Sequence, residues 1–267
     1  MPEIEEFLSD EVDVDENKNS NLEKIMKILV VILIFSLIAT VSLGVYSLIS
    51  FEPANPIIAE TAETYNYIEA ERWYLFSNNK NNDDTAIIFY PKTKIDEQAY
   101  FYFANMLQRR GYDIFIVKSY FHQPSLSLSI IDRVKAEYPK YQEWYLGGHG
   151  SGSDVISRYL VGNKASTIKG AFYLGTVPNE KVRSLNIPLF IALGNKDTVF
   201  DWEAYNNQGK QLMENTELQI IEGGNQTNFG YYELELEDSE ATISPKEQQD
   251  IVANRLDKFI HRNNQSI

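Results

Sequence analysis

The segment EWYLGGHGSGSDVISRYL, residues 143–160, has the pattern of a buried strand, a glycine-rich turn and a helix. Such a turn can present a nucleophilic side chain at its apex, but the apex residue here is Gly150, which has no side chain. The next residue, Ser151, carries a hydroxyl group that could attack a carbonyl carbon in acyl transfer. The backbone amides of Ser151 and Gly152 open the helix and could bind the oxygen of a carbonyl or a carboxylate. We therefore expect a small carbonyl or carboxylate ligand at this turn.

Short apolar strands and amphipathic helices alternate on both sides of the turn. The predicted strands are residues 72–78, 85–91, 112–118, 143–148, 168–175, 187–194 and 217–224. The predicted helices are residues 96–112, 126–141, 151–161, 201–214 and 245–261. This alternation predicts an α/β fold with a mostly parallel sheet and helices on both faces. In such sheets, binding sites form at the carboxyl ends of the strands.

Four stretches of the chain, in this order, are similar to motifs of the alpha/beta-hydrolase superfamily. They are YPKTKIDEQAY from residue 90, IDRVKAEYPKYQEWYLGGHGSG from residue 131, IALGNKDTVFD from residue 191 and IEGGNQTNFGYY from residue 221. Residues 70–262 resemble the compact, lidless bacterial group of this superfamily. The resemblance implies an alpha/beta-hydrolase fold and a catalytic triad of serine, aspartate and histidine.

The resemblance places the three catalytic positions at Gly150, Asp197 and Gln226. The acid position is retained at Asp197, but glycine stands at the nucleophile position and glutamine at the base position. Gly150 has no group that can attack, and the amide of Gln226 does not take up a proton near neutral pH. Glycine also adopts the strained turn of the nucleophile at little cost. We therefore expect a degenerate triad.

A catalytic alternative remains open at two residues. Ser151 could be a displaced nucleophile, although its hydroxyl is well placed to cap the helix that follows. His122, in SYFHQP after a predicted strand, could serve as a substitute base, although it could equally lie in a surface loop. The segment that corresponds to the oxyanion loop carries Lys92 where the group often has a small residue. Lys92 therefore joins Ser151 and Gly152 as a candidate ligand-binding residue.

Residues 28–51 form a run of 24 positions without a charged side chain. A helix of this length can cross a hydrocarbon core of about 30 Å, so we expect it to bind the lipid bilayer as an uncleaved signal anchor. Three lysines precede the run, and no Lys or Arg follows it until Arg72. This asymmetry predicts a single-pass protein of the cell membrane, with a cytoplasmic N-terminus and an extracytoplasmic domain.

The anchor divides the rest of the chain into three parts. Residues 1–27 are acidic and aperiodic, so we expect a disordered cytoplasmic tail. Residues 52–69 carry two prolines and little periodicity, which indicates a stalk. Residues 70–262 then form the folded domain.

Composition excludes several classes of function. The chain of 267 residues has a formal net charge of −14, which argues against binding of nucleic acid. It contains no cysteine and three histidines, so we expect no metal site and no cofactor.

We predict a pseudo-hydrolase that binds a ligand or acts as a scaffold at the bacterial cell surface. The alternatives are an active envelope carboxylester or amide hydrolase that uses Ser151, and a structural partner of another membrane protein of unknown identity.

Overall fold

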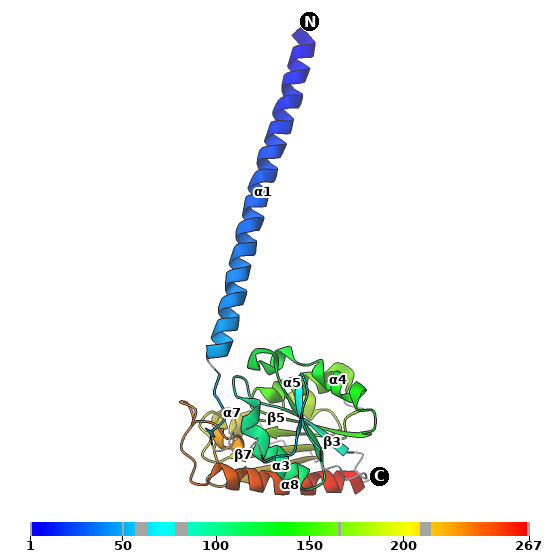
Figure 1. Ribbon diagram of the computed structural model, residues 1–267, viewed down its shortest axis with the longest axis vertical. Helices are drawn as coiled ribbons and strands as arrows, with labels where there is room; N and C mark the ends of the chain where they lie inside the picture. The colour runs from blue at the N-terminus through cyan, green and yellow to red at the C-terminus, as the bar shows by residue number, and fades with distance from the viewer. Residues whose placement is uncertain are drawn as a thin grey trace. The chain divides into compact units, whose positions relative to one another are not determined.

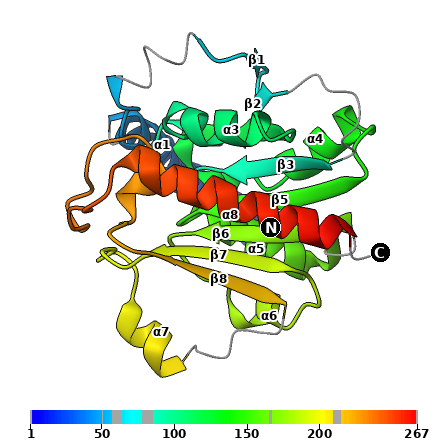
Figure 2. The same cartoon turned by 90° about the horizontal axis from the view of Figure 1, so that it is seen from below.

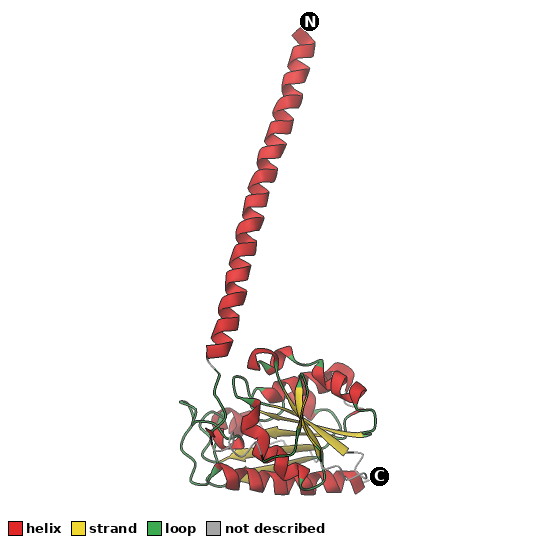
Figure 3. Cartoon of the chain, in the orientation of Figure 1, coloured by secondary structure: helices red, strands yellow, loops and turns green. Residues whose placement is uncertain are grey.

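The computed structural model describes residues 2–49, 51–56, 64–77, 85–164, 167–208 and 215–265. The chain divides into two compact units, Met1–Ser50 and Phe51–Ile267. The first unit is one helix, α1 (Pro2–Ile49), which is drawn in blue in Figure 1. The second unit contains a central sheet with helices around it (Figure 3).

The apolar part of α1 is long enough to cross a membrane. Its candidate span, Asn21–Tyr46, has 26 residues and a mean hydropathy of 2.9, and none of its most apolar stretch is buried within the protein. At 1.5 Å per residue the span is about 39 Å long, more than the thickness of a hydrocarbon core. The structure therefore contains an N-terminal apolar helix that could insert in a membrane, and it overlaps the predicted span of residues 28–51.

The N-terminal acidic segment differs from the expectation of disorder, because α1 continues through it from Pro2. No glycine or further proline interrupts residues 3–43. Acidic side chains near the start of a helix also interact favourably with the helix dipole. Farther along, Glu23 and Lys27 form an exposed pair one turn apart, with 3.8 Å between their charged atoms.

The sheet of the second unit has eight strands in the order β1-β2-β4-β3-β5-β6-β7-β8. The strands are β1 (Ile68–Glu69), β2 (Trp73–Phe76), β3 (Thr85–Tyr90), β4 (Asp113–Val117), β5 (Glu143–His149), β6 (Gly170–Leu174), β7 (Leu189–Gly194) and β8 (Thr216–Ile221). The pairs β1·β2 and β2·β4 are antiparallel, and every other pair is parallel. The carboxyl ends of β3, β5, β6, β7 and β8 therefore lie along one edge of the sheet.

Helices cover both faces of this sheet. They are α3 (Phe101–Gln108), α4 (Ile130–Glu137), α5 (Gly152–Tyr159), α6 (Glu180–Arg183), α7 (Trp202–Gln208) and α8 (Pro245–Gln265). Helices α3 and α8 pack with one core cluster, in front of the sheet in Figure 2. Helices α4, α5 and α6 pack with a second core cluster on the other face. The predicted α/β architecture is therefore confirmed.

One predicted helix is divided in two. The segment 96–112 begins with a 3₁₀ turn at Glu97–Tyr100 and continues as α3. The side chain of Asp96 accepts a hydrogen bond from the amide of Gln98 at 2.8 Å, which caps the turn. The capped turn brings Tyr100 toward the carboxyl end of β3.

Residues 52–69 were predicted to form a stalk. The described residues of this segment, 52–56 and 64–69, pack on the domain. The amide of Glu52 donates to the carbonyl of Lys94 at 2.6 Å, and the amide of Asn55 donates to the carbonyl of Tyr231 at 2.8 Å. β1 then extends the edge of the sheet. Because these backbone groups are satisfied by the domain, the compact unit begins at Phe51 rather than at residue 70. Residues 57–63 lie outside the described chain.

Gly147 in β5 provides a test of the core. A Cβ atom there would lie 1.8 Å from the ring of Phe172, whereas a Cβ at Gly162 would meet nothing within 4 Å. We expect Gly147→Ala to lower the free energy of unfolding by about 1–3 kcal/mol through overpacking. Gly162→Ala should leave it unchanged or raise it by less than about 1 kcal/mol. Urea unfolding followed by circular dichroism measures both variants, and equal effects would contradict the packing described here.

Candidate active site

Two glycines shape the turn between β5 and α5. Gly150 has a φ of 48°, in the left-handed region that favours glycine. A Cβ at Gly152 would lie 2.3 Å from the carbonyl oxygen of Tyr90, at the end of β3. The structure therefore places Gly150 at the apex of a sharp turn on the carboxyl edge of the sheet, directly beside β3.

The side chain of Lys92 lies over this apex. A Cβ at Gly150 would be 3.2 Å from both Cγ and Cδ of Lys92. This distance is tighter than an ordinary van der Waals contact, so Lys92 fills the space that a side chain at position 150 would enter. The absence of a side chain at Gly150 and the position of Lys92 are thus complementary.

Lys92 is held in place by an ion pair. Its Nζ lies 2.6 Å from Oε1 of Glu235 and contacts Oε2 as well. The Lys92 and Glu235 side chains are only 16% and 20% exposed, so solvent screens the pair weakly. The hydroxyl of Tyr232 also donates to Oε1 of Glu235 at 2.7 Å. The segment after β8 is thereby connected to the loop after β3, across the turn.

Ser151 is bound to the loop after β3 rather than to its own helix. Its Oγ donates to Oγ1 of Thr93 at 2.7 Å and accepts the amide of Thr93 at 2.9 Å. It makes no capping hydrogen bond to α5, so the expectation that Ser151 caps the helix is wrong. The close approach of the two loops explains the difference, because it brings the Thr93 amide within reach of the hydroxyl.

His149, at the end of β5, is fully buried beneath the turn. Its Nδ1 lies 2.8 Å from the hydroxyl of Tyr100, which in turn accepts the amide of Lys92 at 3.2 Å. Burial holds the pKa of His149 well below its usual value, and the charge of Lys92 lowers it further. His149 is therefore a neutral imidazole at pH 7, and its hydrogen bond supports Tyr100.

Gln226, after β8, is also buried, with 3% of its surface exposed. Its amide lies against His149 and over the end of β6, where a Cβ at Gly175 would fall 1.6 Å from Oε1. Neither Oε1 of Gln226 nor Nε2 of His149 has a hydrogen-bond partner among the described residues. The residue at the predicted base position is therefore a neutral amide packed between the ends of β5 and β6.

Asp197, after β7, is 2% exposed. Its Oδ1 accepts the amides of Val199 and Phe200 at 2.9 and 2.8 Å, while Oδ2 has no partner within the described chain. The pKa of Asp197 is raised to about 6, chiefly by burial and also by Asp238, although the amides of Phe200 and Val199 and the charge of Lys92 oppose the rise. The carboxylate at the predicted acid position therefore braces its own loop and has no imidazole to orient.

His122 is not a partner of Ser151. Its Nδ1 lies 3.4 Å from Oε1 of Glu97, and its ring stacks on Phe51 with 4.8 Å between centroids. The contact with Glu97 raises the pKa of His122 above its usual value. With the hydroxyl of Ser151 bound to Thr93, these contacts give His122 no part in activating Ser151.

The structure thus brings Gly150, Lys92 and Ser151 together and places neutral His149 with Gln226 below them. The amides of Lys92 and Thr93, in the predicted oxyanion loop, already donate to hydroxyl groups of the protein. At the start of α5, the amides of Ser153 and Asp154 donate to the carbonyls of Gly150 and Ser151 at 3.0 and 3.2 Å, which leaves the amides of Ser151 and Gly152 outside these bonds. Among the described residues, the ammonium of Lys92 is paired with Glu235, and the hydroxyl of Ser151 is bonded to Thr93 rather than to an imidazole.

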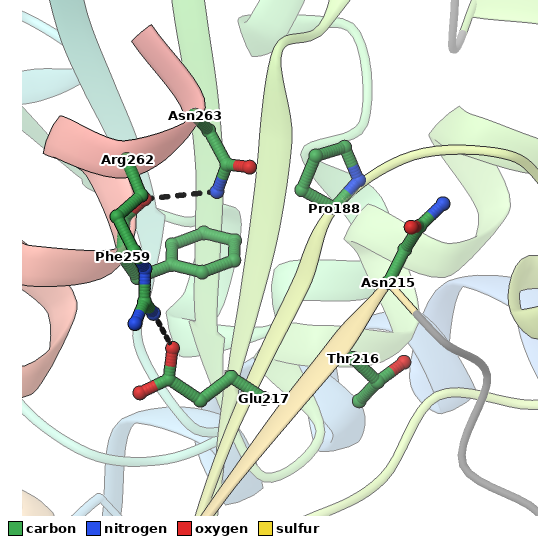
Figure 4. Close-up of a pocket in the computed structure, with 7 residues that line it drawn as sticks. All are labelled: Pro188, Asn215, Thr216, Glu217, Phe259, Arg262 and Asn263. Carbon is green, nitrogen blue, oxygen red and sulfur yellow. Dashed lines mark hydrogen bonds and ion pairs between the residues drawn. The ribbon is translucent and has the colours of Figure 1, made fainter. Parts of the chain in front are cut away.

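Two cavities in the described part of the chain lie away from this turn. One, of about 230 Å³, is located at the amino ends of β7 and β8, opposite the edge that carries Gly150 (Figure 4). There Arg262 of α8 is paired with Glu217 of β8. The other, of about 530 Å³, is lined by side chains of α3 and α8, including Tyr102 and Asp250. Within the described ranges no three His, Asp or Glu side chains form a group that could hold a metal ion.

Comparison with known proteins agrees with this architecture. A model of the alpha/beta hydrolase family matches residues 86–250. The chain belongs to the alpha/beta hydrolase family. A comparison with curated proteins found no match.

Solved structures show the same alpha/beta hydrolase fold at low sequence identity. The esterase domain of a Rhodothermus marinus protein has a TM-score of 0.51 and 11% identity, with 71% of this chain and 92% of that chain covered. Est1E from Butyrivibrio proteoclasticus has a TM-score of 0.51 and 14% identity, covering 74% and 98%. A monoglyceride lipase from Saccharomyces cerevisiae has a TM-score of 0.53 and 11% identity, covering 74% and 94%. At these identities the likeness supports the fold and nothing finer.

The sequence analysis did not identify the residues that bind Lys92 and Ser151. Glu235 is separated from Lys92 by 143 positions, and neither its residue type nor its neighbours mark it as a site residue. Thr93 and Tyr100 belong to the YPKTKIDEQAY stretch, but their hydrogen bonds depend on how closely that loop approaches the turn. A lysine in an oxyanion loop was the one available signal that a carboxylate partner should be sought.

The raised pKa of Asp197 predicts a pH effect on stability. The unfolded chain has an aspartate pKa near 4, so between about pH 4 and pH 6 the native state binds more protons than the unfolded state. Asp197 therefore makes the free energy of unfolding fall as the pH rises through this window. We expect Asp197→Asn to remove this contribution and to raise the free energy of unfolding at pH 7 by about 1–3 kcal/mol.

Urea unfolding at pH 4 and pH 7 measures this effect. The matched control is Glu203→Gln, a loss of one exposed carboxylate on α7. An equal pH dependence in wild type and Asp197→Asn would contradict the assignment.

Proposed function

We propose that this alpha/beta hydrolase family protein is a membrane-anchored pseudo-hydrolase that binds a small carbonyl or carboxylate ligand at the Gly150 turn. The observation that carries the proposal is the position of Lys92, whose side chain lies 3.2 Å from where a Cβ at Gly150 would be. A nucleophile at this position would compete with Lys92 for space. The turn keeps helix amides directed at an oxygen ligand, and the loop adds a positive charge.

The degenerate triad is supported by the surroundings of the two changed positions. Gln226 is packed as a neutral amide, and Asp197 braces its own loop. The hydroxyl of Ser151, the alternative nucleophile, donates a hydrogen bond to Thr93. The segment between β6 and β7 is short and holds only the four-residue helix α6 in its described residues, which supports membership in the lidless group.

We further propose that α1 anchors the domain on the extracytoplasmic side of the cell membrane. The lysines of residues 18–27 precede the apolar span, and the next basic residue after it is Arg72. The positive-inside bias then places the N-terminus in the cytoplasm.

A serine-directed fluorophosphonate tests for loss of catalysis. We expect the wild-type protein to remain unlabelled, because the hydroxyl of Ser151 is bonded to Thr93 and not to a base. The Gly150→Ser, Gln226→His double variant should label, since the turn and Asp197 remain in place. Intact-mass spectrometry gives the extent of labelling in each protein.

Ser151→Ala provides the control for this experiment. If the wild type labels and Ser151→Ala does not, the protein is an active hydrolase with Ser151 as its nucleophile, and the pseudo-hydrolase proposal is wrong.

The topology can be tested with single cysteines, because the natural chain contains none. We expect Ser20→Cys to be protected from a membrane-impermeant maleimide in intact cells, since it lies on the cytoplasmic side. Lys258→Cys, on α8 in the domain, should react. The reverse pattern of labelling would contradict the proposed orientation, and lysed cells show whether each cysteine can react at all.

A further inference from the structure

The loop that follows β4 exposes three large apolar side chains. Phe121 and Leu126 are 56% and 58% exposed, and Tyr120 is 37% exposed. A single exposed apolar side chain is normal on a protein surface, whereas a contiguous group of them marks a contact with a protein or a membrane. Because all three lie within residues 120–126, this loop is a candidate interaction surface.

Hydrogen bonds close the loop, and its backbone is unusual. The amide of Tyr120 donates to Oγ of Ser127 at 3.1 Å, and the amide of Gln123 donates to the carbonyl of Tyr120 at 2.9 Å. Phe121 and His122 have φ angles of 53° and 51°, in the left-handed region that residues other than glycine seldom adopt. Strained residues of this kind cluster at functional sites. The exposure of Phe121 is therefore a feature of a closed, strained loop.

The first residues of the domain are joined to this loop. The ring of Phe51 stacks on the ring of His122, with 4.8 Å between centroids. The amide of Glu52 donates to the carbonyl of Lys94, and the amide of Lys94 donates to the carbonyl of His122 at 2.9 Å. Residues 51 and 52 are thus part of the same surface of the domain as the loop.

The length of the chain keeps this surface close to a membrane that α1 spans. The candidate span ends at Tyr46, and the run without charged side chains ends at Phe51. Five residues reach at most about 18 Å, even when they are fully extended. The headgroup region adds about 5–8 Å on each side of the hydrocarbon core. The surface around Phe51 is therefore held beside the headgroups, where the effective concentration of lipid is high.

The residue types of the loop suit the boundary between lipid and water. Tyrosine is enriched at the level of the headgroups, because its ring is apolar and its hydroxyl is polar. Phenylalanine and leucine are typical of the side chains that surface-bound segments bury at the edge of the acyl region. A protein partner would have to be recruited to this position, whereas lipid surrounds the anchor already. The observations therefore favour lipid as the partner of Tyr120, Phe121 and Leu126.

We propose that residues 120–126 contact the surface of the bilayer that α1 spans, with Tyr120, Phe121 and Leu126 buried in its interfacial region. This inference rests on the proposed anchoring by α1 and adds a second attachment to the same membrane. β4 is parallel to β3, so the loop leaves the sheet at the edge that carries the Gly150 turn. The contact turns this edge of the domain toward the lipid.

The test uses the full-length protein in phosphatidylcholine vesicles in which part of the lipid carries a nitroxide on its acyl chain. Single cysteines can be labelled with the fluorophore NBD, because the natural chain contains no cysteine. Ser125→Cys places the label at an exposed position of the loop and keeps its apolar side chains. Asn186→Cys places it at an exposed position before β7, at the opposite edge of the sheet. We expect nitroxide lipid to quench the label at position 125 and to leave the label at position 186 bright.

Further substitutions show which side chains make the contact. Phe121→Ser together with Leu126→Ser, added to Ser125→Cys, should abolish the quenching, because membrane binding of a surface segment scales with its buried apolar area. Val161→Ser is the matched control, since Val161 is 36% exposed and follows the end of α5, away from the loop. It should leave the quenching at position 125 unchanged. Thermal unfolding followed by circular dichroism shows that each variant is folded.

A label at Ser36→Cys, within the candidate span, separates this inference from the anchor. Quenching at position 36 with none at position 125 leaves the anchor in place and shows that the loop contact is wrong. The loop contact is also wrong if positions 125 and 186 are quenched equally, or if quenching at position 125 survives the loss of Phe121 and Leu126. If neither position 36 nor position 125 is quenched, the anchor and the loop contact both fail.

The same label distinguishes lipid from a protein partner. The vesicles contain no other protein, so quenching in them is due to lipid alone. A label at position 125 that is shielded from aqueous iodide in cell membranes, but is not quenched in the vesicles, would identify a membrane protein as the partner and overturn the lipid contact.

Discussion

The close approach of the backbone after β3 to the turn between β5 and α5 is the constraint on which the site depends. Gly152 permits it, because a Cβ there would lie 2.3 Å from the carbonyl oxygen of Tyr90. The left-handed Gly150 then reverses the chain into α5. With the two loops in contact, Thr93 reaches Ser151 and Lys92 covers the apex. The contacts of Ser151 and Lys92 follow from this approach of the two loops rather than from the sheet alone.

The architecture of the fold does not depend on the catalytic groups of a hydrolase. The sheet order, the turn and the buried carboxylate of Asp197 are set by packing and backbone geometry, which do not need a nucleophile. Catalysis needs a hydroxyl, an imidazole and a carboxylate in mutual contact. Here the hydroxyl of Ser151 is bonded to Thr93, and the imidazole of His149 to Tyr100. The hydroxyl of Ser151 and the imidazole of His149 are thus bonded to different neighbours and not to each other.

The fold could be predicted from the sequence because its signals are local. Apolar runs such as residues 187–194 and amphipathic segments such as residues 245–261 indicate buried strands and helices by themselves. The position of Gly150 at the apex of the turn could also be predicted from the sequence, since it depends on a short motif. The hydrogen bonds of Ser151 and the partner of Lys92 were not visible, because they join segments 58 and 143 positions apart. The packing of residues 52–55 on the domain was missed for the same reason.

The site can be understood as a balance of charge in a partly closed space. Lys92 brings a positive charge next to a turn whose helix amides already favour an anion. A poorly exposed ammonium without a counter-charge is costly, so a carboxylate must be present, either from the protein or from a ligand. Glu235 meets this need in the structure, with support from the hydroxyl of Tyr232.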